Sequence, residues 1–149
     1  MTNIYIKDAP GHVGDEVKIK GWAYNFRSSG SIYFLQLRDG SGRIQGIISK
    51  KDVAPELWEN LAKITMETSV IVGGKLRAEA RAPSGVELDV SSLEIFAISA
   101  EYPIAKKEHG TDFLMDNRHL WIRSSRQEAI LRVRSEIEQS FRDFFYARG

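Results

Sequence analysis

A chain of 149 residues is long enough for one domain of ordinary size, or for one compact domain with an appendage. Its hydrophobic content of 42% and charged content of 28% are typical of a soluble globular protein. No apolar run approaches the ~20 residues of a membrane-spanning helix, and the N-terminus lacks the basic flank and apolar core of a signal peptide. The absence of cysteine excludes disulfides and thiolate metal sites, and it fits a cytoplasmic location.

The net charge of +1 says little by itself, because nucleic-acid binders often carry a basic patch on a protein that is neutral on average. One basic group lies in the first third of the chain and consists of Lys18, Lys20, Arg27, Arg38 and Arg43. A second group lies near the C-terminal end and consists of Arg118, Arg123, Arg126, Arg132 and Arg134. Charge alone favours reading each group as a solvated face.

Three strands are predicted in the first third of the chain. Residues 17–24 alternate between apolar and polar side chains, as a half-buried strand does. Residues 32–37 are rich in aromatic and branched side chains, and residues 43–48 form the third strand. Gly30-Ser31 and the sequence Asp-Gly-Ser-Gly at 39–42 are turn signals that separate these strands.

The next elements are a helix and two further strands. Residues 55–63 change to a helical period and begin with proline. A fourth strand is predicted over residues 69–76, with a bulge or bend at 73–74, and a fifth over residues 86–98, with a break near 91–92.

Three strands, a helix and two strands follow one another in an OB-fold, a five-stranded Greek-key barrel, so we expect a mainly β domain of this type over residues 1–101. Another small β-barrel or a sandwich has a similar strand content. The helix between the third and fourth strands favours the OB-fold.

Residues 102–123 are expected to form a hinge, because Pro103 and the run Lys-Lys-Glu-His-Gly at 106–110 show no periodicity. A long helix is predicted within residues 124–149. Ser125 and Glu128 have the spacing of a capping box. The apolar residues that follow at spacings of mostly three and four are Ile130, Val133, Ile137, Phe141, Phe144 and Phe145.

The first three strands combine aromatic residues, arginines and a glutamine, which suits a surface for unstacked nucleotide bases. A base offers a π-face on which an aromatic ring can stack, and an edge that an amide can read. The sequence therefore predicts binding of single-stranded RNA.

Two stretches resemble the N-terminal part of class II aminoacyl-tRNA synthetases of the aspartate, asparagine and lysine subgroup. The first is the series Gly-Trp at 21–22, Phe-x-x-Leu-Arg-Asp at 34–39 and Gly-x-x-Gln at 42–45. The second, Arg-His-Leu-Trp-Ile-Arg-Ser-x-Arg-Gln at 118–127, is most similar to asparaginyl-tRNA synthetases. The resemblance implies that the OB-fold binds a tRNA anticodon, with asparagine preferred over aspartate and lysine third.

The resemblance also implies roles for individual residues. The aromatic at the position of Phe34 stacks on the central uridine of these anticodons, the glutamine at the position of Gln45 bonds a uridine edge, and the arginine at the position of Arg27 meets the anticodon loop. Secondary candidates for RNA contact are Trp22, Lys20 and Arg43. Strand parity alone leaves open that Phe34 points inward as a core residue.

The sequence departs from these synthetases in one large respect, because it carries none of the ATP, magnesium or amino-acid binding motifs of their catalytic domain. We therefore expect no catalytic residue, metal or cofactor in this chain, and no activity of the chain alone. ATP and Mg²⁺ are expected for the full-length enzyme, with residues 124–149 as the first helix of a truncated catalytic domain. The expected partners are tRNA with the asparagine anticodon, the missing catalytic domain and a homodimer partner, without a membrane.

Two alternatives remain open from the sequence. One is a stand-alone OB module that binds single-stranded nucleic acid without catalysis. The other is the same anticodon-binding role in an aspartate–tRNA ligase.

Overall fold

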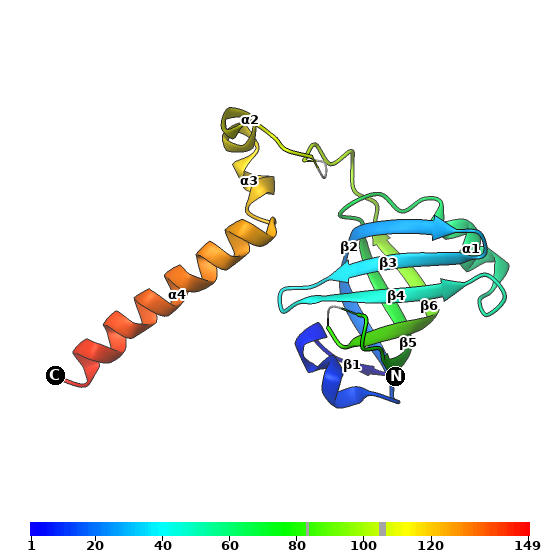
Figure 1. Ribbon diagram of the computed structural model, residues 1–149, viewed down its shortest axis with the longest axis horizontal. Coiled ribbons are helices and arrows are strands. Elements are labelled where there is room, and N and C mark those ends of the chain that lie inside the picture. Colours follow the sequence, from blue (N-terminus) through cyan, green and yellow to red (C-terminus); the bar gives the residue numbers. More distant parts are fainter. Residues whose placement is uncertain (83, 105–106) are drawn as a thin grey trace. The chain divides into compact units, whose positions relative to one another are not determined.

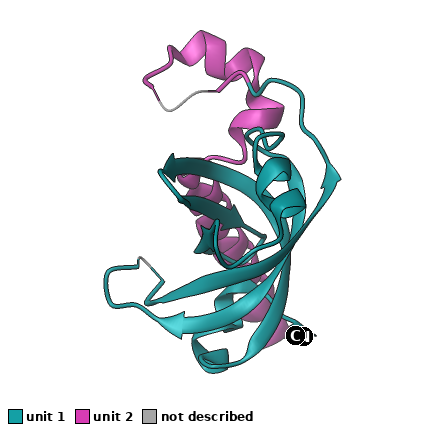
Figure 2. Ribbon diagram, turned by 90° about the vertical axis from the view of Figure 1, so that its right-hand side faces the viewer, with its two compact units in different colours: residues 1–102 teal, residues 103–149 magenta. Residues whose placement is uncertain are grey.

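The computed structural model describes every residue except 83, 105 and 106. The chain divides into two compact units, Met1–Tyr102 and Pro103–Gly149 (Figure 2). No helix in the described part of the chain is long and apolar enough to cross a membrane.

The first unit contains the predicted strands and helix, preceded by two elements that the sequence reading missed. Its elements are β1 (Thr2–Asn3), the 3-10 helix η1 (Ile6–His12), β2 (Glu16–Ser29), β3 (Ile32–Arg38), β4 (Arg43–Ser49), α1 (Pro55–Leu61), β5 (Ser69–Ala78) and β6 (Val86–Ala97). β1 and η1 were missed because a strand of two residues and a short 3-10 helix are too short for a periodic pattern to be recognised.

Five strands close into a ring around the core (Figure 1). β2 pairs antiparallel with β3 at one side and with β5 at the other, and β3 pairs antiparallel with β4. β4 then pairs parallel with β6, which pairs antiparallel with β5. The order β2-β3-β4-β6-β5 returns to β2, and α1 lies between the third and fourth of these strands in the chain, as the OB-fold prediction requires.

The inner faces of the strands supply the core. Burial alternates along most of β2, β3, β4 and β5, except that Arg38 at the end of β3 and Gly73 in β5 are also buried. The largest fully buried apolar side chains are Ile19, Leu35, Leu37, Ile48, Leu76 and Leu88. Each stabilises the fold by about 1.5–3 kcal/mol through burial.

One tyrosine belongs to this core. Tyr33 is buried, its ring stacks on Phe26 with centroids 6.0 Å apart, and its hydroxyl donates to the carbonyl of Leu61 at 3.4 Å. Burial raises the pKa of Tyr33 to about 12, because the apolar surroundings disfavour the phenolate. The hydroxyl end of the Tyr33 side chain therefore links β3 to the end of α1.

Two glycines allow strands to approach closely where the barrel coils. A side chain at Gly21 would strike the carbonyl of Arg38, and a side chain at Gly74 would strike the carbonyl of Asp89. The predicted irregularity at Gly73-Gly74 is confirmed, since the pairing of β5 with β6 shifts there.

The predicted break in the last strand is wrong. β6 runs through Ser91-Ser92 without interruption. Gly73 pairs with Ser92 and Gly74 with Val90, so Ser91 is an extra residue in a β-bulge. A bulge looks like a break in the sequence because the alternation changes phase, although the strand continues.

The helices in the described part of the second unit are α2 (Thr111–Asp116), α3 (Arg118–Trp121) and α4 (Ser125–Tyr146). Part of the predicted hinge at 102–123 is therefore helical. These two helices of six and four residues are too short to show a helical period in the sequence. Residues 105 and 106 of the predicted hinge lie outside the described residues.

The long helix was predicted correctly, but its capping residue was not. The N-cap is Ser124, whose hydroxyl accepts a hydrogen bond from the backbone N–H of Gln127 at 3.4 Å. Ser124 and Gln127 have the same spacing as the predicted pair one residue later, which explains the shift of one position.

Candidate nucleic-acid interface

Cross-strand pairing gathers the main candidate residues on the outer face of β2, β3 and β4. Arg27 of β2 lies opposite Phe34 of β3, and Gln36 of β3 lies opposite Gln45 of β4. Residues that lie opposite each other in a sheet point to the same side. Phe34 is half-buried on this outer face and does not belong to the core cluster, so the structure rejects the alternative that it points inward.

A β-bulge in β2 decides which side Arg27 faces. The pairing with β3 shifts between Ala23 and Asn25, which makes Tyr24 an extra residue. Strict alternation from the buried Ala23 would turn Arg27 toward the core. The bulge reverses the phase, so Phe26 packs against the core and Arg27 is exposed.

Arg27 and Phe34 are already in contact. The guanidinium carbon of Arg27 lies 4.2 Å from the centroid of the Phe34 ring. This cation–π contact keeps a positive charge beside the aromatic ring. A nucleotide has the matching combination of a flat base and an anionic phosphate.

The amide of Gln45 is held by a chain of charged groups. Gln45 Nε2 donates to Glu87 Oε1 at 2.7 Å, and Arg77 donates to the same carboxylate at 2.6 Å. Arg77 also donates to Asp89 at 3.0 Å. One N–H of the Gln45 amide is engaged by Glu87, which orients the amide and leaves its carbonyl oxygen free to accept from a ligand.

A hollow of about 180 Å³ opens beside this amide. Its lining residues are Tyr24, Gln36, Arg43, Ile44, Gln45 and Ser84. The guanidinium carbon of Arg43 lies 4.2 Å from the centroid of the Tyr24 ring. Two amides, a guanidinium and an aromatic ring thus converge in one concave place, with the groups needed to read a base edge.

A buried ion pair supports the neighbouring aromatic rings. Arg38 Nη2 donates to Glu67 Oε2 at 2.6 Å, and both side chains are buried. The Arg38 guanidinium also lies 5.8 Å from the ring centroid of Trp22 and 5.6 Å from that of Tyr24. Trp22 remains partly exposed, so its ring belongs to the outer surface rather than to the core.

The structure brings most of the predicted residues together and leaves one apart. Trp22 lies opposite Arg38, which lies opposite Arg43, so both secondary candidates adjoin Gln36 and Gln45 on the outer face. Lys20 lies in a part of β2 that pairs with β5 and lines a different hollow.

The sequence reading missed Tyr24, Gln36 and Glu87 as members of this site. Glu87 reaches Gln45 through parallel pairing of β4 with β6, across 42 residues of sequence. No local pattern encodes such a contact. Tyr24 and Gln36 could have been found from the sequence, since both stand at the polar, outward-facing positions of the predicted alternating strands.

No group of three or more histidine, aspartate or glutamate side chains in the described part of the chain could hold a metal ion. The side chains that line the site offer stacking, hydrogen bonding and charge neutralisation.

Known proteins similar to this chain were found by sequence and by structure. The model of the OB-fold nucleic acid binding domain family matches residues 17–96. An asparagine–tRNA ligase of Desulforamulus reducens is 52% identical over 145 residues, which are 97% of this chain and 34% of that protein. The ligase of Symbiobacterium thermophilum is 51% identical over 149 residues, which are 100% of this chain and 34% of that protein.

Solved structures give the same result. Asparaginyl-tRNA synthetase from Pyrococcus horikoshii matches with a TM-score of 0.90 and 33% identity, over 98% of this chain and 36% of that one. The Entamoeba histolytica enzyme in complex with asparaginyl-adenylate matches with a TM-score of 0.83 and 31% identity, over 100% of this chain and 36% of that one. Aspartyl-tRNA synthetases at 23% and 24% identity share the fold.

The chain spans about a third of the length of the curated relatives that it matches. The expected resemblance to asparaginyl-tRNA synthetases and the expected OB-fold are both confirmed by these matches. The family model covers more than half of the residues, and the chain belongs to the family of OB-fold nucleic acid binding domains.

Proposed function

We propose that this chain recognises the anticodon of the asparagine tRNA as the N-terminal part of an asparagine–tRNA ligase. The observation that carries the proposal is the placement of Phe34 on the outer face of the barrel, in contact with Arg27 and on the same face as Gln45. The high identity to asparagine–tRNA ligases over nearly the whole chain supports the choice of tRNA.

Phe34 is the stacking platform in this proposal. Its ring stands on β3 between paired strands, and it is only partly buried, so part of its surface is accessible to a ligand. A base that leaves the stack of the anticodon loop regains a π-contact on this ring, which is worth about 1–3 kcal/mol.

Gln45 reads the edge of the stacked base. Uridine carries a hydrogen on N3, whereas the N3 of cytidine is an acceptor. With one N–H donated to Glu87, Gln45 is oriented so that its carbonyl oxygen can accept from uridine N3–H, a donor that cytidine lacks at N3. This orientation supports a central uridine in the recognised anticodon.

Arg27 and Arg43 supply the electrostatic part of binding. Both guanidinium groups lie over aromatic rings on the same outer face. Binding that neutralises phosphates releases counterions, so affinity falls as salt rises.

We assign the activation of asparagine with ATP and Mg²⁺ to the part of the relatives that this chain does not span. The donor groups of the described residues do not fit a Mg²⁺ site, because their carboxylates form no cluster suited to a metal. The full enzyme would attach asparagine to the tRNA in the cytoplasm, with the catalytic domain and a homodimer partner. The apolar face of α4 supports the proposal that residues 124–149 begin that domain.

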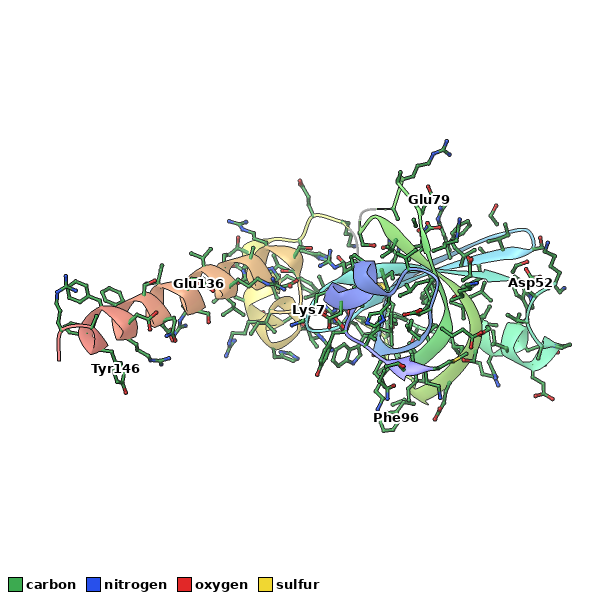
Figure 3. The ribbon with its side chains drawn as sticks, turned by 90° about the horizontal axis from the view of Figure 1, so that it is seen from below. Lys7, Asp52, Glu79, Phe96, Glu136 and Tyr146 are labelled. Carbon is green, nitrogen blue, oxygen red and sulfur yellow. The ribbon has the colours of Figure 1, made fainter. Side chains whose placement is uncertain are left out.

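The test is a titration of wild type and Phe34→Ala with an RNA hairpin that carries the asparagine anticodon. We expect Phe34→Ala to weaken binding by about 5- to 150-fold, which corresponds to the loss of one stacked base. The matched control is Phe96→Ala, because Phe96 is an exposed phenylalanine on β6 at the outside of the barrel (Figure 3).

Two outcomes would contradict the proposal. The first is a folded Phe34→Ala variant, checked by circular dichroism, that binds the hairpin as tightly as wild type. The second is equal wild-type affinity for this hairpin and for one of unrelated anticodon sequence, which would indicate the stand-alone nucleic-acid-binding module instead.

A further inference from the structure

A second hollow lies on the barrel where the N-terminal segment meets β2. Its volume is about 250 Å³, and its lining residues are Asn3, Ile4, Tyr5, Lys18 and Lys20. Two of these side chains are cationic, one is aromatic and one is an amide. No carboxylate belongs to the lining.

The backbone that presents Tyr5 is held on both sides. Ile4 N donates to the carbonyl of Lys18 at 3.0 Å, and Ile6 N donates to the carboxylate of Asp39 at 2.8 Å. Ser41 of the same hairpin accepts from Lys7 N at 3.0 Å. The Tyr5 side chain is nevertheless 65% exposed.

The exposed ring of Tyr5 keeps apolar surface in water, which is unfavourable, and no contact among the residues that the structure describes compensates for it. In the described part of the chain, no hydrogen bond and no ring contact engages the Tyr5 side chain. The backbone at Tyr5 is thus held in place, and the ring is accessible for a partner to stack on it.

The two lysines of this hollow have no carboxylate partner among the described residues. Arg38 and Arg77, by contrast, are engaged by Glu67, Glu87 and Asp89. Lys18 and Lys20 occupy successive outward positions of β2, and Trp22 occupies the next one. The positive charges of Lys18 and Lys20 therefore lie on the same outer face of β2 as Trp22, next to the proposed anticodon site.

We propose that this hollow binds a second nucleotide of the same RNA, outside the base read by Gln45. Tyr5 stacks on its base, and Lys18 and Lys20 neutralise the adjoining phosphates. This inference rests on the proposed function, because the hollow adjoins the proposed anticodon face through Trp22. An aromatic ring flanked by unpaired cations is the combination that single-stranded nucleic acid requires.

The test uses the full 149-residue chain and the same hairpin at several salt concentrations. Tyr5→Ala is expected to weaken binding by about 5-fold or more, whereas Tyr5→Phe keeps the ring and stays close to wild type. Tyr146→Ala is the control for loss of an exposed tyrosine, since Tyr146 is the last residue of α4 (Figure 3).

The lysines are tested by the salt dependence. For Lys18→Ala/Lys20→Ala, the slope of log affinity against log salt should decrease in magnitude by about 1.4, the value for two phosphate contacts on a single strand. The control Lys63→Ala/Lys107→Ala removes the same charge from α1's end and from the second unit, and it should leave that slope unchanged.

The outcomes separate this inference from the proposed function. If Phe34→Ala weakens binding while the Tyr5 and double-lysine variants match wild type, the second nucleotide site is wrong and the anticodon site stands. If the Tyr5 and double-lysine variants weaken binding while Phe34→Ala does not, the anticodon site is misplaced and the hollow is confirmed as an RNA site. If Lys63→Ala/Lys107→Ala lowers the slope as much as Lys18→Ala/Lys20→Ala, the effect is general charge, which also overturns the inference.

Discussion

At the scale of single residues, the orientation of one amide carries the proposed discrimination between bases. Gln45 donates to Glu87, and Glu87 is held in turn by Arg77. Glu87 is buried and can only accept when it is ionised, so it selects the N–H side of the amide. In the proposed complex, the carbonyl oxygen of Gln45 accepts from the base.

Replacing Glu87 by glutamine should remove this selection. A glutamine at 87 can donate as well as accept, so Gln45 is no longer held with its carbonyl outward. We expect Glu87→Gln to reduce the preference for uridine over cytidine at the central position, while total affinity changes less. The measurement is the ratio of dissociation constants for two hairpins that differ in that base.

Asp89→Asn is the matched control for the loss of a negative charge. Asp89 contacts Arg77 but not Gln45. If Asp89→Asn and Glu87→Gln change the ratio equally, the preference depends on charge near Arg77 and the assignment to the Gln45 amide is wrong.

At the scale of elements, a turn before β5 supports the bulge of β2. Glu67 N donates to the carbonyl of Ala23 at 2.8 Å, and Ala23 N donates to the carbonyl of Thr68 at 2.9 Å. Glu67 has a φ of 67°, in the left-handed region that is costly for a residue with a side chain. Its carboxylate reaches Arg38 on β3, so the turn joins two strands at the bulge.

Glu67→Ala should therefore be strongly destabilising. It leaves the buried guanidinium of Arg38 without this carboxylate, which typically costs about 3–5 kcal/mol. The free energy of unfolding, measured by urea denaturation, tests the prediction. Glu79→Ala is the control, since Glu79 pairs with Arg77 at the longer distance of 3.6 Å and should change stability by less than about 1 kcal/mol.

A second readout follows the aromatic rings. Trp22 and Tyr24 both lie near the Arg38 guanidinium, so its displacement should change the ring environment and weaken hairpin binding. A Glu67→Ala variant as stable as wild type would mean that the pair contributes nothing to the barrel.

At the scale of the whole molecule, the two compact units differ in how far they bury their apolar side chains. The barrel unit packs its apolar cluster into one core and leaves a few large residues exposed, among them Tyr5, Trp22 and Phe96. α4 exposes its whole apolar stripe, and Ile137, Phe141, Phe144 and Phe145 line a hollow of about 390 Å³ on that helix. Exposed contiguous apolar surface of this kind favours association.

We expect the 149-residue chain to self-associate as its concentration rises, and a chain of residues 1–102 to remain monomeric. Burial of each large side chain of the stripe is worth up to about 1.5–3 kcal/mol. Sedimentation velocity over a range of concentrations measures this. Phe141→Asp/Phe145→Asp should restore the monomer, and a strictly monomeric wild-type chain would show that the stripe does not drive association.

Much of this protein follows from local sequence patterns. The alternation of β2 up to Ala23, the turn at Asp39, the helix at Pro55 and the apolar stripe of α4 are each encoded within a few residues. These signals are readable because side-chain direction repeats with a fixed period in a strand or helix. Together with the sequence motifs, they were sufficient for the fold and the family.

The tertiary structure decided what depends on register between distant segments. The bulge at Tyr24 turns Arg27 outward, and parallel pairing of β4 with β6 brings Glu87 to Gln45. The hydrogen bond from Ile6 to Asp39 places Tyr5 at the second hollow. A one-residue change of register reverses the face of every following side chain, and only the closed barrel fixes that register.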